Sequence, residues 1–138
     1  RMGPEYPNNK NTQIVLPELS YKIVGSAFTV FNSVGYGMSE RHYQKLLATE
    51  FGFQRIPFEM EKQIDFLYHG QHVGKYFADF VVDQKVIVEL KVRPKLGYSH
   101  VQQVMGYLRN TGYKLAILIY FTREGVKCRR VLNARVAE

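Results

Sequence analysis

Two short apolar stretches, residues 76–82 and 86–92, lie on either side of the polar segment 83–85. Stretches of this length that are rich in Val, Ile and Phe predict β-strands. A separation of three polar residues predicts that the two strands form an antiparallel hairpin. The hairpin limits the fold to one built on a sheet, and the length of its loop places Asp79 directly opposite Glu89.

Three charged residues interrupt these strands, Asp79 in the first and Glu89 and Lys91 in the second. Side chains alternate between the two faces of a strand, so Ile87, Glu89 and Lys91 share one face. Directly opposed residues have Cβ atoms roughly 4.5–5.5 Å apart, and two carboxylates at that separation repel each other. A divalent cation between them removes the repulsion, and oxygen ligands of this kind favour Mg²⁺ or Mn²⁺.

A purely structural interpretation of the same three charges stays open. In it, Glu89 and Lys91 form an ion pair and Asp79 caps the hairpin, within an α/β protein whose charges pair internally. The two interpretations differ in what a neutral residue at position 79 does. Loss of a structural partner lowers stability, whereas relief of repulsion in an empty cation site raises it.

The chain has 138 residues, with 19 basic and 12 acidic side chains, which gives a net charge of +7. A basic protein favours polyanionic partners, and we expect nucleic acid. The length fits one domain over residues 17–138, preceded by a polar, flexible N-terminal arm over residues 1–16. Cys128 is the sole cysteine, so a reducing, cytoplasmic location is expected, and the absence of a long apolar stretch predicts no membrane association.

The spacing of apolar residues predicts the remaining elements. Helices are expected from residue 17 to near residue 33, from residue 39 to near residue 51, and over residues 99–110; strands are expected over residues 59–68, 115–121 and 126–132, with a turn at residues 69–72. This order indicates an α/β fold with a mixed sheet of four or five strands flanked by helices. The crossover helix predicts that strands 86–92 and 115–121 run parallel.

Other polar residues lie on the two later helices. Glu40 is in the first turn of the second helix, where interaction with the helix dipole alone stabilises a carboxylate by roughly 0.3–1 kcal/mol. His100, Gln103 and Tyr107 form a stripe on the third helix beside its apolar face. For His100, a hydrogen bond to the backbone at the start of the helix is an alternative structural role.

In this order, the motifs resemble those of the PD-(D/E)XK nuclease superfamily and, within it, the GxxExxY family. The resemblance spans about residues 20–121. Its residues are Gly37-Met38-Ser39-Glu40-Arg41-His42-Tyr43, then Asp79, Glu89-Leu90-Lys91, and His100, Gln103 and Tyr107 followed by Leu108 and Thr111-Gly112. One departure is Ala78, which stands where the name of the superfamily has proline.

The resemblance implies a restriction-endonuclease-like αβββαβ core and a nuclease that depends on Mg²⁺ or Mn²⁺. It implies that Asp79 and Glu89 bind the ion with the backbone carbonyl of Leu90, and that Glu40 reaches it directly or through water. It also implies that Lys91 orients or deprotonates the attacking water. Gln103 and Tyr107 then help to place Lys91 and the nucleic acid.

The expected function is therefore phosphodiester hydrolysis, with DNA favoured over RNA as substrate. Arg93 and Lys95 are candidate phosphate contacts, His100 is a further candidate for nucleic-acid binding, and Tyr98 and Tyr36 are candidates for stacking on bases. Solvated surface side chains are the alternative for Arg93, Lys95 and the two tyrosines. An alternative for the whole protein is a non-catalytic nucleic-acid-binding or assembly module, and a homodimer would let two sites meet two strands.

Overall fold

The structure is a computed structural model that describes residues 16–95 and 99–133. The described elements are α1 (Pro17–Val34), α2 (Glu40–Phe53), β1 (Phe58–Tyr68), β2 (Gln71–Val82), β3 (Val86–Val92), α3 (Ser99–Arg109), β4 (Leu115–Thr122) and β5 (Gly125–Leu132). The arm expected over residues 1–16 lies outside the described residues except for Leu16, and Tyr98 also lies outside them. Within the described part of the chain, no helix is long and apolar enough to cross a membrane.

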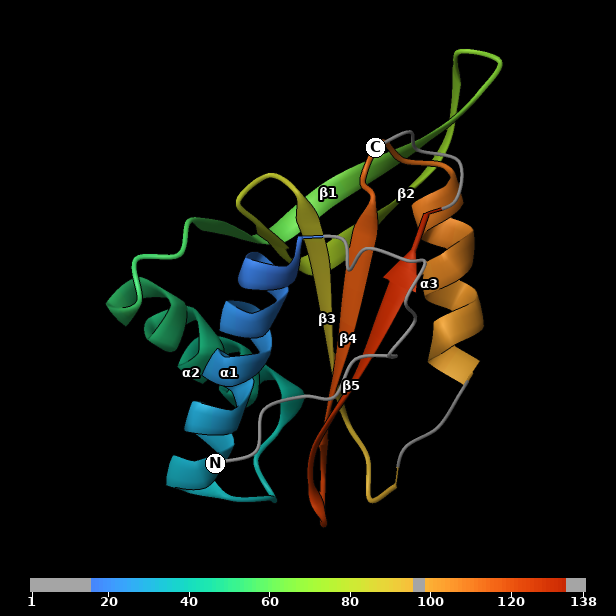
Figure 1. Cartoon of the computed structure of the whole chain (residues 1–138). Helices are drawn as coiled ribbons and strands as arrows, with labels where there is room; N and C mark the ends of the chain where they lie inside the picture. Colours follow the sequence, from blue (N-terminus) through green and yellow to red (C-terminus); the bar gives the residue numbers. More distant parts are fainter. Residues whose placement is uncertain (1–15, 96–98, 134–138) are drawn as a thin grey trace, which may run out of the picture.

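The strands form one sheet in the order β1-β2-β3-β4-β5. Neighbouring strands are antiparallel except β3 and β4, which run parallel because α3 carries the chain across the sheet between them. Helices α1 and α2 cover one face and α3 covers the other (Figure 1). This arrangement confirms the expected α/β fold with a mixed sheet.

Two layers of apolar side chains hold the helices to the sheet. Val86, Val88 and Leu90 of β3 belong to the cluster under α1 and α2, whereas Ile87 belongs to the cluster under α3. The alternation predicted for this strand is therefore present, and it assigns Glu89 to the face that α3 covers. All eight residues of β4 are buried, because helices cover both faces of the central strands.

The hairpin between β2 and β3 has the predicted loop and register. Strand β2 ends at Val82 and β3 begins at Val86, and these two residues pair with each other. Asp83 and Gln84 in the loop have φ values of 50° and 55°. The paired residues continue to Phe80 and Val88 in the register expected from the sequence.

The hairpin between β1 and β2 differs from the expectation. The predicted four-residue turn at 69–72 is wrong: the turn consists of His69 and Gly70, which have φ values of 49° and 77°, and β2 begins at Gln71. Two successive positive φ angles are typical of a tight hairpin turn. This hairpin projects past the remaining strands (Figure 1), and its outer part lacks the apolar pattern of a covered strand.

Candidate active site

Strand β2 has an irregularity at Asp79. In the described strands, paired residues of β1 and β2 run on either side of Glu61 and Asp79 but do not include these two. The pairing of β2 with β3 ends one residue before Asp79, at Phe80 and Val88. Glu61 has a φ of 50°, in the left-handed region that residues other than glycine rarely adopt. The backbone of Asp79 therefore lies outside both ladders.

The side chain of Asp79 reaches across to β3. Its Oδ2 accepts a hydrogen bond of 2.7 Å from the backbone N–H of Leu90, and its charge raises the pKa of the neighbouring Glu89 carboxyl group. The N–H and C=O of one strand residue point toward the same neighbouring strand, so the Leu90 carbonyl also faces β2. The structure thus brings Asp79, Glu89 and the Leu90 carbonyl together, as the resemblance implies.

The two carboxyl groups lack sufficient compensating charge. Burial, followed by the charge of Asp79, raises the pKa of Glu89 from 4.5 to about 9. Burial also raises the pKa of Asp79, although the Leu90 hydrogen bond and the charge of Lys91 act in the opposite direction. Among the described residues, the buried Oε1 atom of Glu89 has no hydrogen-bond partner. An oxygen pair of this kind is suited to binding a cation.

The available oxygen atoms fit a hard divalent ion. Two carboxylates and a carbonyl are the ligand types that Mg²⁺ and Mn²⁺ prefer, with water completing the shell. In residues 16–95 and 99–133, no group of three or more Asp, Glu, His or Cys side chains is close enough to hold a metal ion. The protein side chains of the candidate metal site are therefore Asp79 and Glu89, without Glu40.

Glu40 instead contacts a basic residue at the end of β3. Its Oε2 lies 3.3 Å from Nη1 of Arg93, and Nη2 of Arg93 lies 3.5 Å from Nε2 of His100. The charge of Glu40 contributes to the raised pKa of Asp79, which indicates that Glu40 is still near the carboxyl pair. Burial, followed by the charges of Lys91 and Arg93, lowers the pKa of His100. These three residues form a polar rim beside Lys91.

The stripe on α3 is connected to an aromatic stack. Gln103 Nε2 donates a 2.8 Å hydrogen bond to the Tyr107 hydroxyl, and the Tyr107 ring stacks on Tyr76 with centroids 4.1 Å apart. Phe66 packs on the other two rings. Burial, followed by the charge of Glu89, raises the pKa of Tyr76, which indicates that the stack lies beside the carboxyl pair. Lys95 is exposed beyond the end of β3.

Sequence reasoning missed two residues of this region, Tyr76 and Gln44. Tyr76 lies in an apolar stretch, where an aromatic residue predicts core packing and nothing more. Gln44 is a buried glutamine on α2 that donates a hydrogen bond to the Asp79 carbonyl. A single polar residue on a helix gives no sequence signal for a partner 35 positions away.

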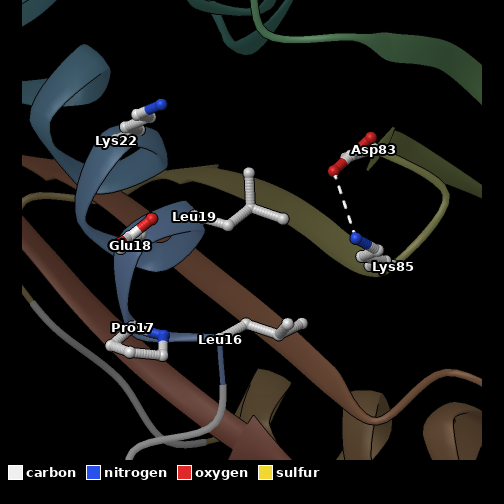
Figure 2. A pocket seen from close by; sticks show the side chains of 7 residues that line it. All are labelled: Leu16, Pro17, Glu18, Leu19, Lys22, Asp83 and Lys85. Atoms are coloured by element: carbon white, nitrogen blue, oxygen red, sulfur yellow. Dashed lines mark ion pairs between the residues drawn. The ribbon is translucent and has the colours of Figure 1, made fainter.

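A hollow of about 390 Å³ lies at the opposite end of β3 (Figure 2). The start of α1 and the β2–β3 loop line it, and Asp83 and Lys85 form an ion pair of 3.5 Å at its edge. It contains none of the candidate site residues. We therefore assign it no part in the chemistry of the carboxyl pair.

Comparisons with known proteins identify a family and a similar fold. Residues 17–131 match the family model described as the PD-(D/E)XK nuclease superfamily. The crystal structure of SSO0001 is similar in fold, with a TM-score of 0.52, 16% sequence identity and coverage of 89% of this chain. The aligned part is 59% of that protein, so the chain spans about three fifths of its length. No curated protein matches the chain significantly.

Proposed function

This chain belongs to the PD-(D/E)XK nuclease superfamily, and from that premise we propose that it hydrolyses phosphodiester bonds with a divalent cation held by Asp79 and Glu89. The proposal rests on the surroundings and the raised pKa of the Glu89 carboxyl group. Its carboxyl group is largely buried beside a second carboxyl group, its pKa is raised to about 9, and its Oε1 atom has no hydrogen-bond partner among the described residues. A stable fold does not need this arrangement, whereas a cation site does.

Each residue of the site has a distinct proposed role. Asp79, Glu89 and the Leu90 carbonyl hold Mg²⁺ or Mn²⁺, which when bound supplies Lewis acidity to a phosphate oxygen. Lys91 lies beside the carboxyl pair, where its ammonium group would orient the attacking water and stabilise negative charge that develops on the phosphoryl oxygens, or its neutral amine would deprotonate the water. Glu40 acts through water, because its carboxylate is already in contact with Arg93.

We propose DNA as the substrate, contacted by basic side chains and an imidazole near Lys91. The net charge of +7 favours a polyanion. Three residues that follow β3 in the chain are suited to phosphate contacts: Arg93, Lys95 and His100.

We also assign the chain to the GxxExxY family, in which the motif tyrosine would be Tyr43. Here Tyr43 is buried and stacks on Phe121 with centroids 4.1 Å apart, which supports a structural role for that residue.

The test is cleavage of circular, linear and single-stranded DNA and of RNA by the purified protein, with Mg²⁺, Mn²⁺ or a chelator. Wild type should cut DNA in the presence of either ion, and Glu89→Gln and Lys91→Ala should not. Glu124→Gln, at the exposed turn between β4 and β5, is the matched control and should cut as wild type does. Binding of DNA without any cleavage would instead show a non-catalytic module. Cleavage that persists in Glu89→Gln would exclude this site.

A further inference from the structure

We infer that Gln44 is a positioning residue that keeps the Asp79 carboxylate on the face of the sheet where Glu89 lies. This inference rests on the proposed function, since it assigns Gln44 a part in forming the cation site. Gln44 lies on α2 and is 6% exposed. Among the described contacts, its side chain bonds to Glu61 and to the Asp79 backbone, and not to the carboxyl groups of Asp79 and Glu89. Its effect therefore passes through the backbone of Asp79.

The Gln44 amide bridges the irregularity in the sheet. Its Nε2 donates to the backbone carbonyl of Asp79 at 3.2 Å and to Oε1 of Glu61 at 2.9 Å. An amide nitrogen has two N–H groups, so these two bonds use both of them. Glu61 and Asp79 are left out of the described β1–β2 pairing, between the pairs Met60–Phe80 and Lys62–Ala78. Gln44 thus supplies the hydrogen bond that the Asp79 carbonyl does not receive from a strand.

The irregularity changes which face of the sheet the side chains occupy. Ala78 and Val81 both pack in the cluster under α3, although residues three apart in a regular strand point to opposite faces. In β1, Phe58 packs against the α1–α2 cluster and Ile64 in the α3 cluster, although residues six apart should share a face. Both strands therefore switch faces near Glu61 and Asp79.

This switch is what places Asp79 beside Glu89. A regular continuation of β2 from Ala78 would direct Asp79 to the α1–α2 face. The Asp79 carboxylate would then point away from the Leu90 N–H, from which it accepts a hydrogen bond in the structure. The interrupted conformation is costly without Gln44, because the half-buried Asp79 carbonyl would lose this hydrogen bond and no bond from Gln44 would offset the left-handed φ of Glu61. A glutamate at position 44 could not donate, and it would repel Glu61.

The experiment compares Gln44→Leu and Gln44→Asn with wild type and with Ile23→Val, a control in the core of α1. The leucine variant removes the amide, and the asparagine variant keeps it on a shorter side chain, so one of them can be studied if the other does not fold. The first readout is the backbone amide of Leu90 by NMR in the presence of a chelator. The second is Mn²⁺ affinity by calorimetry.

We expect the Leu90 amide signal to shift and its hydrogen exchange to accelerate at least about tenfold in the Gln44 variants, because its bond to Asp79 is lost. We also expect Mn²⁺ affinity to fall about 10- to 100-fold, the usual effect of removing a residue that supports a metal ligand. Ile23→Val should change neither readout. An unchanged Leu90 signal, or an altered signal with unchanged Mn²⁺ affinity, would overturn the inference. If wild type binds no Mn²⁺, the proposed function fails, and the Leu90 signal alone still decides the role of Gln44.

Discussion

Replacement of Glu89 by glutamine should change how the stability of the metal-free protein depends on pH. The pKa of Glu89 rises from 4.5 to about 9 because the carboxyl group is buried beside Asp79. Between these two values the folded protein keeps a proton that the unfolded chain releases. The free energy of unfolding of wild type should therefore fall as pH rises through this interval, whereas Glu89→Gln has no proton to release.

The magnitude follows from the single proton involved. One proton released on unfolding lowers the free energy of unfolding by about 1.4 kcal/mol per pH unit. Between about pH 6 and about pH 8, wild type should thus lose about 3 kcal/mol relative to Glu89→Gln. The assay is urea unfolding in the presence of a chelator at several pH values, followed by far-UV circular dichroism because the chain has no tryptophan.

The control is Glu124→Gln, which changes the same functional group at an exposed turn and should keep the wild-type slope. Addition of Mn²⁺ should remove the slope in wild type, because a bound cation stabilises the ionised carboxylates. Parallel pH dependence of wild type and Glu89→Gln would refute the reasoning. It would mean that Glu89 is ionised in the folded protein without any cation.

Three further outcomes follow from the geometry. Lys91→Met should lower the cleavage rate by at least about 100-fold, the usual contribution of a group that handles the proton, while calorimetry shows Mn²⁺ affinity within a few-fold of wild type. Tyr107→Ala should lower the free energy of unfolding by about 2 kcal/mol through loss of the stack on Tyr76, whereas Tyr107→Phe keeps the stack and should cost less than about 1 kcal/mol in urea unfolding. Ser39→Ala should cost about 1 kcal/mol in the same assay, because the Ser39 hydroxyl accepts the His42 N–H at the start of α2.

The parts of the molecule predicted from the sequence are those that depend on local pattern. The apolar runs predicted strands β3 and β4, and the helical spacing of apolar residues predicted helices α1 to α3. The three-residue loop at 83–85 predicted the register of the β2–β3 hairpin. The register in turn placed Asp79 near Glu89. Alternation along β3 also predicted correctly that Val86, Val88 and Leu90 share one face and that Ile87 lies on the other.

The parts not predicted depend on contacts between distant segments. The outer part of β2 lacks an apolar pattern because no helix covers it, so its start was placed too late. The contact of Glu40 with Arg93 joins residues 53 positions apart, and nothing in the first turn of α2 indicates it. The face switch at Asp79 depends on a left-handed φ at Glu61, a non-glycine residue, and on the amide of Gln44. The secondary-structure propensities of Glu61 and Gln44 predict neither the left-handed φ nor the hydrogen bonds of the amide.

The position of a bound Mn²⁺ ion decides whether the carboxyl pair is a cation site. Crystals grown or soaked with Mn²⁺ should show anomalous scattering between the side chains of Asp79 and Glu89, next to the Leu90 carbonyl, and crystals of Glu89→Gln should not. Absence of a peak there in wild type, or a peak bound by other residues, would contradict the assignment of this site.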